Sequence, residues 1–217
     1  MKQHNLLKNL LLSATAAMGL AGFARADVPL DKEPLTSTTE VGQGLLGQQY
    51  ASLTYSYIDL DDVSTHADDY TFGFNQPLSA GLDAVFSYDY LRTGSFAGSH
   101  LSQHAIMAGL RAFGHRAAWG KPYVEAGAGY AWQRFAGAKD NSFVWGLGVG
   151  AEIQLAPAFT LTPSIKYADA PDLAGSGTWT YGVKANYWVD SQWSVTAGID
   201  RDDDQNNSFT IGTNFRF

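Results

Sequence analysis

Apolar and polar residues alternate along most of the C-terminal half of this chain. In "TWTYGVKANYWV" (178–189), every second residue from Trp179 to Val189 is apolar, whereas the residues between them are mostly Thr, Gly, Lys and Asn. The same period of two runs through 143–155, 159–168, 192–200 and 208–217. Successive side chains of a β-strand point to opposite faces, so the pattern predicts strands with one apolar and one polar face.

The first half of the chain carries weaker versions of this pattern. They are found in "YASLTYSYI", "YTFGFN", "LDAVFSYDYL", "QHAIMAGLRAF" and "YVEAGAGYAWQ", which brings the predicted number of strands to ten, with eight as the alternative. Short connections, such as "NQPLSAG", "HRAAWGK", "APA" and "DSQ", alternate with longer ones, such as "DLDDVSTHADD", "TGSFAGSH", "AGAKDN", "DAPDLAGSG" and "RDDDQNN". This rhythm indicates antiparallel hairpins in sequence order.

Three features favour a membrane barrel, with its apolar face outside, over a soluble barrel. Charged residues make up 16% of the chain, fewer than a water-facing surface normally carries. Trp and Tyr gather toward the strand ends, as in interfacial girdles. No Asp, Glu or Lys falls in the middle of an apolar face, where a charge costs roughly 2–4 kcal/mol, and Arg92, Arg134 and Arg201 lie on that face only at strand ends. We therefore predict an all-β, antiparallel, up-and-down transmembrane β-barrel, which also leaves no unpaired sheet edge in lipid.

The N-terminal residues read as a secretory signal. Lys2 and Lys8 precede the apolar stretch "LLLSATAAMGLAGF", and "ARA" predicts cleavage after Ala26. We assign 1–26 to the signal peptide, 27–46 to an extended N-terminal lead and 47–217 to the barrel. Loss of the signal would make the net charge of −7 more negative, which argues against a nucleic-acid-binding surface, and the absence of cysteine excludes disulfides and thiolate sites.

With this signal, these strands and the C-terminal "NFRF", the chain resembles the small outer-membrane β-barrels of Gram-negative-type bacteria, the OmpA/OmpX-like group. The resemblance covers essentially all of the chain after residue 26. It implies a location in the bacterial outer membrane, contact with outer-membrane lipid and lipopolysaccharide, and a monomer. It also implies that Phe215 and Phe217 form a signal for the barrel-assembly machinery, although Phe217 could instead belong only to the aromatic girdle. The best-known members have eight strands, whereas ten are predicted here.

The polar faces would enclose the lumen of such a barrel. The charged residues on them are Asp83, Asp89, Arg111, Glu125, Glu152, Lys166, Lys184, Asp200 and Arg216. With both termini in the periplasm, Asp83, Arg111, Glu125 and Glu152 lie near the periplasmic end, whereas Lys166, Lys184 and Asp200 lie nearer the middle or the outer half. Because buried charges persist when they are paired, we predict two ion-pair networks that help to plug the barrel, with Arg111 offering its guanidinium to Asp83 and Glu125. The alternative is a wet lumen in which these charges have no defined partners.

We predict that glycines on the lumen side leave space for large inward side chains. Glycines 127, 129, 146, 148 and 150 fall on the polar faces, where they leave room for inward groups such as Met107, Tyr123 and Trp188.

One stretch, "HLSQH", invites an enzymatic interpretation. His100, Ser102 and His104 share the lipid-facing side, and the spacing is similar to that of outer-membrane lipid A deacylases, in which a His activates a Ser. General-base activation needs a third group to orient the His, and we find no acid on the lipid-facing ends of the neighbouring strands. Gln103 also stands where that family has Asn. We therefore predict no enzymatic activity, no cofactor and no metal site, and we read the acidic segments "IDLDDVSTHADDY" and "DRDDDQNN" as solvated loops.

The predicted function is a structural or surface-interaction role of an outer-membrane barrel with a largely filled lumen. A narrow passive channel for small solutes or ions is the first alternative, and a lipid-modifying enzyme is the second.

Overall fold

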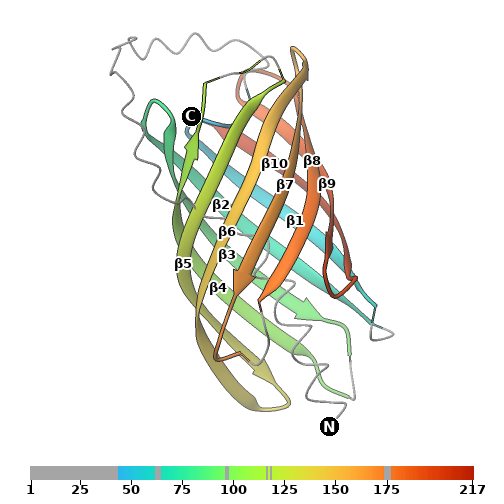
Figure 1. The fold of residues 1–217 in the computed structure, drawn as a ribbon. Coiled ribbons are helices and arrows are strands. Elements are labelled where there is room, and N and C mark those ends of the chain that lie inside the picture. Colours follow the sequence, from blue (N-terminus) through green and yellow to red (C-terminus); the bar gives the residue numbers. More distant parts are fainter. Residues whose placement is uncertain (1–43, 62–64, 96–97, 116, 118, 174–176) are drawn as a thin grey trace.

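A computed structural model describes residues 44–61, 65–95, 98–115, 117, 119–173 and 177–217 as one closed barrel of ten strands (Figure 1). Every strand pairs antiparallel with its neighbours in sequence, and β1 pairs with β10 to close the sheet. The strands are β1 Tyr50–Leu60, β2 Thr65–Ser79, β3 Leu82–Thr93, β4 Leu101–Phe113, β5 Lys121–Phe135, β6 Ala138–Ala156, β7 Phe159–Asp169, β8 Thr178–Trp188, β9 Trp193–Asp202 and β10 Asn207–Arg216. The predicted ten-stranded antiparallel barrel is confirmed. The predicted signal peptide and most of the predicted lead lie outside the described residues.

The barrel has two distinct rims. Tyr50 at the start of β1 pairs with Arg216 at the end of β10, so we call this end, uppermost in Figure 1, the terminal rim. The opposite end, where β1 leads into β2, is called the loop rim. Within the described part of the chain, no helix is long and apolar enough to span a membrane.

The connections follow the predicted rhythm only in part. The segment "AGAKDN" is not a long loop, because Ala136 and Gly137 form a tight turn and β6 begins at Ala138. Their φ angles of 49° and 86° are those of the hairpin turns whose twist matches that of the flanking strands. Conversely, the segment predicted as an acidic loop is partly strand, because β1 extends to Leu60 and β2 begins at Thr65.

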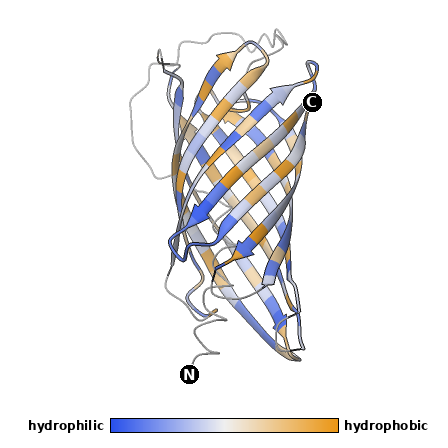
Figure 2. Ribbon diagram, turned by 90° about the vertical axis from the view of Figure 1, so that its right-hand side faces the viewer, coloured by the Kyte–Doolittle hydropathy of each residue, from blue (hydrophilic) through white to orange (hydrophobic). Residues whose placement is uncertain are grey.

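Apolar and polar residues alternate along the strands, as Figure 2 shows. Leu147 and Ile199 on the outward face are 49% and 56% exposed, although they are large and apolar. Gly148 lies against the side chain of Glu125 inside the barrel, and Gly198 lies against that of Lys184. An outward face of exposed Leu, Ile, Val, Phe, Tyr and Trp suits lipid, so the predicted orientation of the two faces is confirmed.

Aromatic side chains pack against one another at the terminal rim. Trp193 and Phe215 have ring centroids 4.7 Å apart, Phe215 and Phe217 5.2 Å, and Phe74 and Phe217 6.3 Å. The backbone N–H of Phe217 donates to the carbonyl oxygen of Gln49, which ties the last residue to the start of β1. In the adjacent turn at 189–192, the Asp190 carboxylate accepts hydrogen bonds from the backbone N–H groups of Trp193 and Gln192, which hold the pKa of Asp190 below its usual value.

Candidate functional site in the barrel lumen

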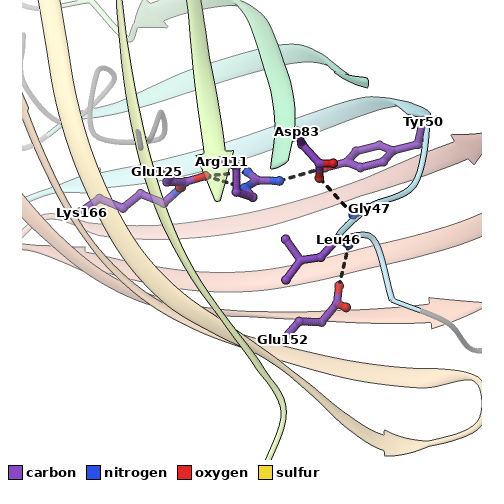
Figure 3. Close-up of polar contacts among 8 residues, drawn as sticks. All are labelled: Leu46, Gly47, Tyr50, Asp83, Arg111, Glu125, Glu152 and Lys166. Atoms are coloured by element: carbon purple, nitrogen blue, oxygen red, sulfur yellow. Dashed lines mark hydrogen bonds and ion pairs between the residues drawn. The ribbon is translucent and has the colours of Figure 1, made fainter. Parts of the chain in front are cut away.

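A buried ion pair lies on the terminal side of the lumen. Asp83, Arg111 and Glu125 stand opposite one another on β3, β4 and β5, at the common depth that the sequence predicts. Arg111 Nε and Nη2 each lie 2.7 Å from Glu125 Oε2, and Lys166 Nζ on β7 lies 3.7 Å from Glu125 Oε1 (Figure 3). The Glu125 side chain is only 1% exposed, so its charge depends on these two cations.

The predicted bridge from Arg111 to Asp83 is not found among the described residues. The remaining Arg111 nitrogen, Nη1, lies 3.5 Å from the Tyr50 hydroxyl, and the guanidinium lies over the Tyr123 ring at 5.3 Å. Asp83 Oδ2 instead accepts a hydrogen bond of 3.0 Å from the backbone N–H of Gly47. We predicted partners for Asp83 among charged side chains alone, and a side-chain pattern does not reveal that a backbone N–H group binds this carboxylate.

Glu152 on β6 likewise binds backbone, and among the described residues it forms no ion pair. Its Oε2 accepts hydrogen bonds from the N–H groups of Leu45 and Leu46. Figure 3 shows the bond from Leu46. A buried carboxylate is stabilised by N–H donors as well as by cations, because either supplies hydrogen bonds to the charged form. Asp83 and Glu152 therefore serve as anchors for the chain that precedes β1.

We call residues 44–47 the terminal cap. Besides its bonds to Asp83 and Glu152, the cap receives a hydrogen bond of 3.3 Å from Arg216 Nη2 to the carbonyl oxygen of Gly44. Asn75 Nδ2 fixes the next residue by donating to the Gln48 carbonyl oxygen at 2.7 Å. The Leu46 side chain is 4% exposed. The cap thus occupies the lumen at the terminal rim, although the sequence assigned 44–46 to an extended N-terminal lead.

Lys184 on β8 and Asp200 on β9 face the lumen as predicted, but they do not complete a second ion-pair network. Within the described part of the chain, neither has an oppositely charged side-chain atom within 4.0 Å. The stem of Lys184 crosses Gly198, and the carboxylate of Asp200 crosses Gly182. For these two residues, the geometry agrees with the alternative of charges without a defined ionic partner.

Uncharged polar side chains join β8, β9 and β10 on the lumen side. Asn214 Nδ2 donates to Ser194 Oγ and Thr196 Oγ1, both at 2.9 Å, and Thr196 Oγ1 donates to Asn186 Oδ1. Nearby, the Arg216 guanidinium stacks over the buried Trp188 ring at 3.9 Å. These residues were predicted to point inward, but period alone does not reveal which of them bond to one another.

An apolar cluster that was not predicted from the sequence lies in the lumen at the loop rim. We call it the apolar plug; its members are Ile58, Leu60, Ala67, Leu91, Leu101, Ala105, Met107, Ala131, Val144, Ala170 and Leu173. Leu91 and Leu101 are 1% and 2% exposed. The signal was present, because these strand residues lie in register with the inward polar ones: Ile58 and Leu60 continue the face of Ser56.

Leu173 reaches the plug from the connection between β7 and β8. The backbone N–H of Asp172 donates to Ser142 Oγ at 3.1 Å, and that of Leu173 donates to the Ala170 carbonyl oxygen at 2.9 Å. These bonds fold the start of the connection over the barrel mouth and leave Leu173 only 2% exposed.

A cavity of about 220 Å³ lies between the terminal cap and the plug. Leu45 and Leu46 border it on the cap side and Met107 on the plug side, and its wall includes Lys166 and Lys184.

On the plug side of the lumen, Thr71 Oγ1 donates to Asp89 Oδ1 at 2.6 Å and also lies 3.3 Å from Asp69 Oδ2. No cluster of three or more His, Asp or Glu side chains suited to a metal ion is found in the described residues.

The predicted packing of large inward side chains against glycine is found at two positions. A Cβ built on Gly150 would lie 2.5 Å from the Tyr123 hydroxyl, and one built on Gly129 would lie 2.8 Å from Met107 Cγ. Both distances are shorter than a van der Waals contact. Glycine on β5 and β6 therefore makes room for side chains that cross the lumen.

Comparison with known proteins gives structural likeness without sequence kinship. No family model matches the sequence, and no curated protein matches it. The translocator domain of the autotransporter NalP from Neisseria meningitidis superposes with a TM-score of 0.52 and 13% identity, covering 81% of this chain and 90% of that one. This is the fold of bacterial outer-membrane β-barrels.

Two further solved structures show a weaker similarity. An outer-membrane channel of Pseudomonas putida F1 has a TM-score of 0.49 and 9% identity over 82% of this chain and 98% of that one. Neisserial surface protein A has a TM-score of 0.42 and 12% identity over 81% of this chain and 100% of that one. The outer-membrane barrel predicted from the sequence, and its place in the bacterial outer membrane, agree with this fold. At these identities, the likeness speaks for the fold alone.

The "HLSQH" motif of this outer-membrane barrel lies at the loop rim, on the outward face that was predicted for it. His104 Nδ1 lies 2.8 Å from the Tyr88 hydroxyl, and His100 Nδ1 lies 3.1 Å from the Thr93 carbonyl oxygen. Among the described residues, no hydrogen bond joins Ser102 to either histidine. The side chains directly opposite Ser102 on β3 and β5 are Arg92 and Arg134, and neither can act as the acid of a triad.

Proposed function

We propose that this protein is a non-conducting outer-membrane barrel that acts through its outer surface, with the terminal rim toward the periplasm and the loop rim toward the cell exterior. The observation that carries the proposal is the double obstruction of the lumen, by the terminal cap at one rim and the apolar plug at the other. Solute passage would require both to move. Assembly as a monomer, with recognition of Phe215 and Phe217 by the barrel-assembly machinery, completes the proposal.

Each obstruction has a separate physical basis. The cap is held by charge-assisted hydrogen bonds: its N–H groups donate to Asp83 and Glu152, and Arg216 donates to its Gly44 carbonyl oxygen. Water can replace these bonds at a moderate free-energy cost. The plug is held by burial of apolar surface, and wetting it costs about 25 cal/mol for each Å² exposed. A fluctuation that releases one obstruction leaves the other intact, so the two act in series.

A narrow channel is the second candidate, and one observation favours it. Among the described residues, the cavity between the obstructions is bordered by charged side chains of both signs, and residues 44–47 cover it on the terminal side. The charged side chains are Arg111, Lys166, Lys184, Glu125 and Glu152. Displacement of the cap together with rearrangement of the plug would leave a charged, water-accessible constriction suited to small solutes or ions. Catalysis has less support, because Ser102 has arginines and not an acid as its neighbours.

Planar-bilayer recordings of four forms would separate the two candidates. They are the wild type, a deletion of 27–46, the triple variant Leu91→Ser, Leu101→Ser and Met107→Ser, and the combination of deletion and triple variant. We expect a steady conductance only from the combination, because each single lesion leaves one obstruction in place. Heat-modified mobility on gels would verify that each form is folded. Steady conductance of the wild type would refute the proposal, and conductance of the deletion alone would show that the plug does not block ions.

A further inference from the structure

A row of aligned residues crosses the outward face near the loop rim, from β2 to β6. Paired in register, the row consists of Asp68, Arg92, Ser102, Arg134 and Lys139. Arg92, Arg134 and Lys139 are all exposed. Three cations thus gather on one side of a barrel whose chain carries a net charge of −7.

The described structure shows no ion pair for these three cations. In the described part of the chain, none of them has an acidic oxygen within 4.0 Å. Asp68, the acid nearest in the row, instead accepts a hydrogen bond of 2.7 Å from the Tyr55 hydroxyl and lies 3.7 Å from His66 Nε2. Within the described protein, no acidic side chain therefore lies at ion-pair distance from these three cations.

A band of stacked rings lies one step nearer the middle of the barrel. This second row lies two residues away from the charged row along each of β2 to β5 and consists of Tyr70, Tyr90, His104 and Trp132. The ring centroids of neighbours are 6.4 Å, 4.9 Å and 5.4 Å apart, and His104 lies nearly parallel to Trp132 at 12°. The next step contains Phe72, Ile106, Tyr130 and Phe143, which are each about half exposed. Polarity therefore changes from charged to aromatic to apolar within a few residues.

Strand geometry sets the dimensions of this surface. Two residues of a strand span about 7 Å, so the cations lie just outside an interfacial aromatic band, at the level of lipid headgroups. Neighbouring strands are about 4.8 Å apart, so three steps from Arg92 to Lys139 extend over about 14 Å. One phosphate cannot contact both ends of such a row, but a headgroup with two separated phosphates can.

We propose that Arg92, Ser102, Arg134 and Lys139 form a docking site for the phosphates of a multiply phosphorylated glycolipid in the leaflet around the loop rim. The two guanidinium groups can each offer two N–H donors to a phosphate, Lys139 provides a third charge at the far end, and the Ser102 hydroxyl between the arginines adds a donor. The stacked band beneath the row supports the sugar and acyl portions. The "HLSQH" motif is then part of a binding surface: Ser102 meets the phosphates and His104 belongs to the aromatic band.

Native mass spectrometry of the folded protein in detergent would test the site with three probes: bis-phosphorylated lipid A, the same lipid without phosphates, and phosphatidylglycerol. We expect the wild type to retain the phosphorylated lipid about tenfold more strongly than either other probe. The triple variant Arg92→Gln, Arg134→Gln and Lys139→Gln should lose this preference. Arg201→Gln is the matched control, because Arg201 is also exposed near the loop rim but lies on β9, outside the row, and it should keep the preference.

Three results would overturn the site: equal retention of phosphorylated and dephosphorylated lipid A, an equal loss in Arg201→Gln, or retention of phosphatidylglycerol as strong as that of lipid A. The charge-conserving pair Arg92→Lys and Arg134→Lys should retain most of the binding, which checks that charge and not packing is lost. If the triple variant does not show heat-modified mobility, Lys139→Gln alone should still weaken retention about threefold. The assay takes place in detergent and does not depend on conductance, so its outcome is independent of the proposed closed lumen.

Discussion

Removal of either partner of the Arg111–Glu125 pair should destabilise the barrel, and the two losses should not add when both partners are removed. Arg111→Ala leaves the buried Glu125 carboxylate with Lys166 Nζ at 3.7 Å as its remaining ion-pair partner among the described residues. Breaking a buried pair costs about 3–5 kcal/mol, and water from the adjacent cavity should reduce this to about 2–3 kcal/mol. Glu125→Ala should cost a similar amount, because the partners that Arg111 then keeps in the described structure are the Tyr50 hydroxyl and the Tyr123 ring.

The double variant should cost about as much as either single one, which gives a coupling free energy of about 2 kcal/mol. Urea titrations in phospholipid vesicles, followed by tryptophan fluorescence, would measure the free energy of unfolding of all four forms. Lys184→Ala is the matched control, because Lys184 faces the same lumen without an ion pair in the described chain. It should cost less than about 1 kcal/mol.

Additive effects would refute this reasoning. If the double variant loses the sum of the two single losses to within about 0.5 kcal/mol, the two side chains do not depend on each other. A Lys184→Ala variant as unstable as Arg111→Ala would show that any lumen cation matters equally, whatever its partner.

Three further predictions test other parts of the barrel. Deletion of Phe217 should slow insertion into the outer membrane and lower the yield of heat-modifiable protein in cell fractions, whereas unchanged insertion would assign Phe217 to the girdle alone. Ser102→Ala should leave the lipid A mass spectrum of expressing cells unchanged, and a change in acyl chains would restore the deacylase interpretation. Leu91→Ala in the apolar plug should lower the free energy of unfolding by about 2–5 kcal/mol, against less than about 0.5 kcal/mol for Arg201→Gln at the surface; equal losses would mean that Leu91 is not packed.

The sequence predicts the architecture well because a strand in a membrane barrel has a strict period. The faces of Leu147, Lys184 and Ile199 follow from counting by two, and the strand directions then place Asp83, Arg111 and Glu125 at one depth. The alternation of apolar and polar residues does not show which lumen side chains bind one another. Asp83 binds the N–H of Gly47, since backbone donors compete with the guanidinium of Arg111 and leave no mark in a pattern of side chains.

The apolar plug was missed for a different reason. The prediction placed a few large side chains, such as Met107, in the lumen but did not expect a cluster of apolar ones, and it assigned the segment around Ile58 and Leu60 to the start of an acidic loop. Once β1 continues to Leu60, both residues necessarily point inward. Leu173 could not have been found in this way, because it reaches the plug from a connection and not from a strand.

The terminal cap has a consequence for the order of events during biogenesis. Its binding groups come from Asp83 on β3, Glu152 on β6 and Arg216 on β10, so contacts of the cap join residues up to 172 positions apart in the chain. No partial sheet that lacks the last strand contains all of these groups. Docking of 44–47 can therefore be completed only after β10 has met β1, and protection of the cap from protease would mark the moment at which a barrel has closed.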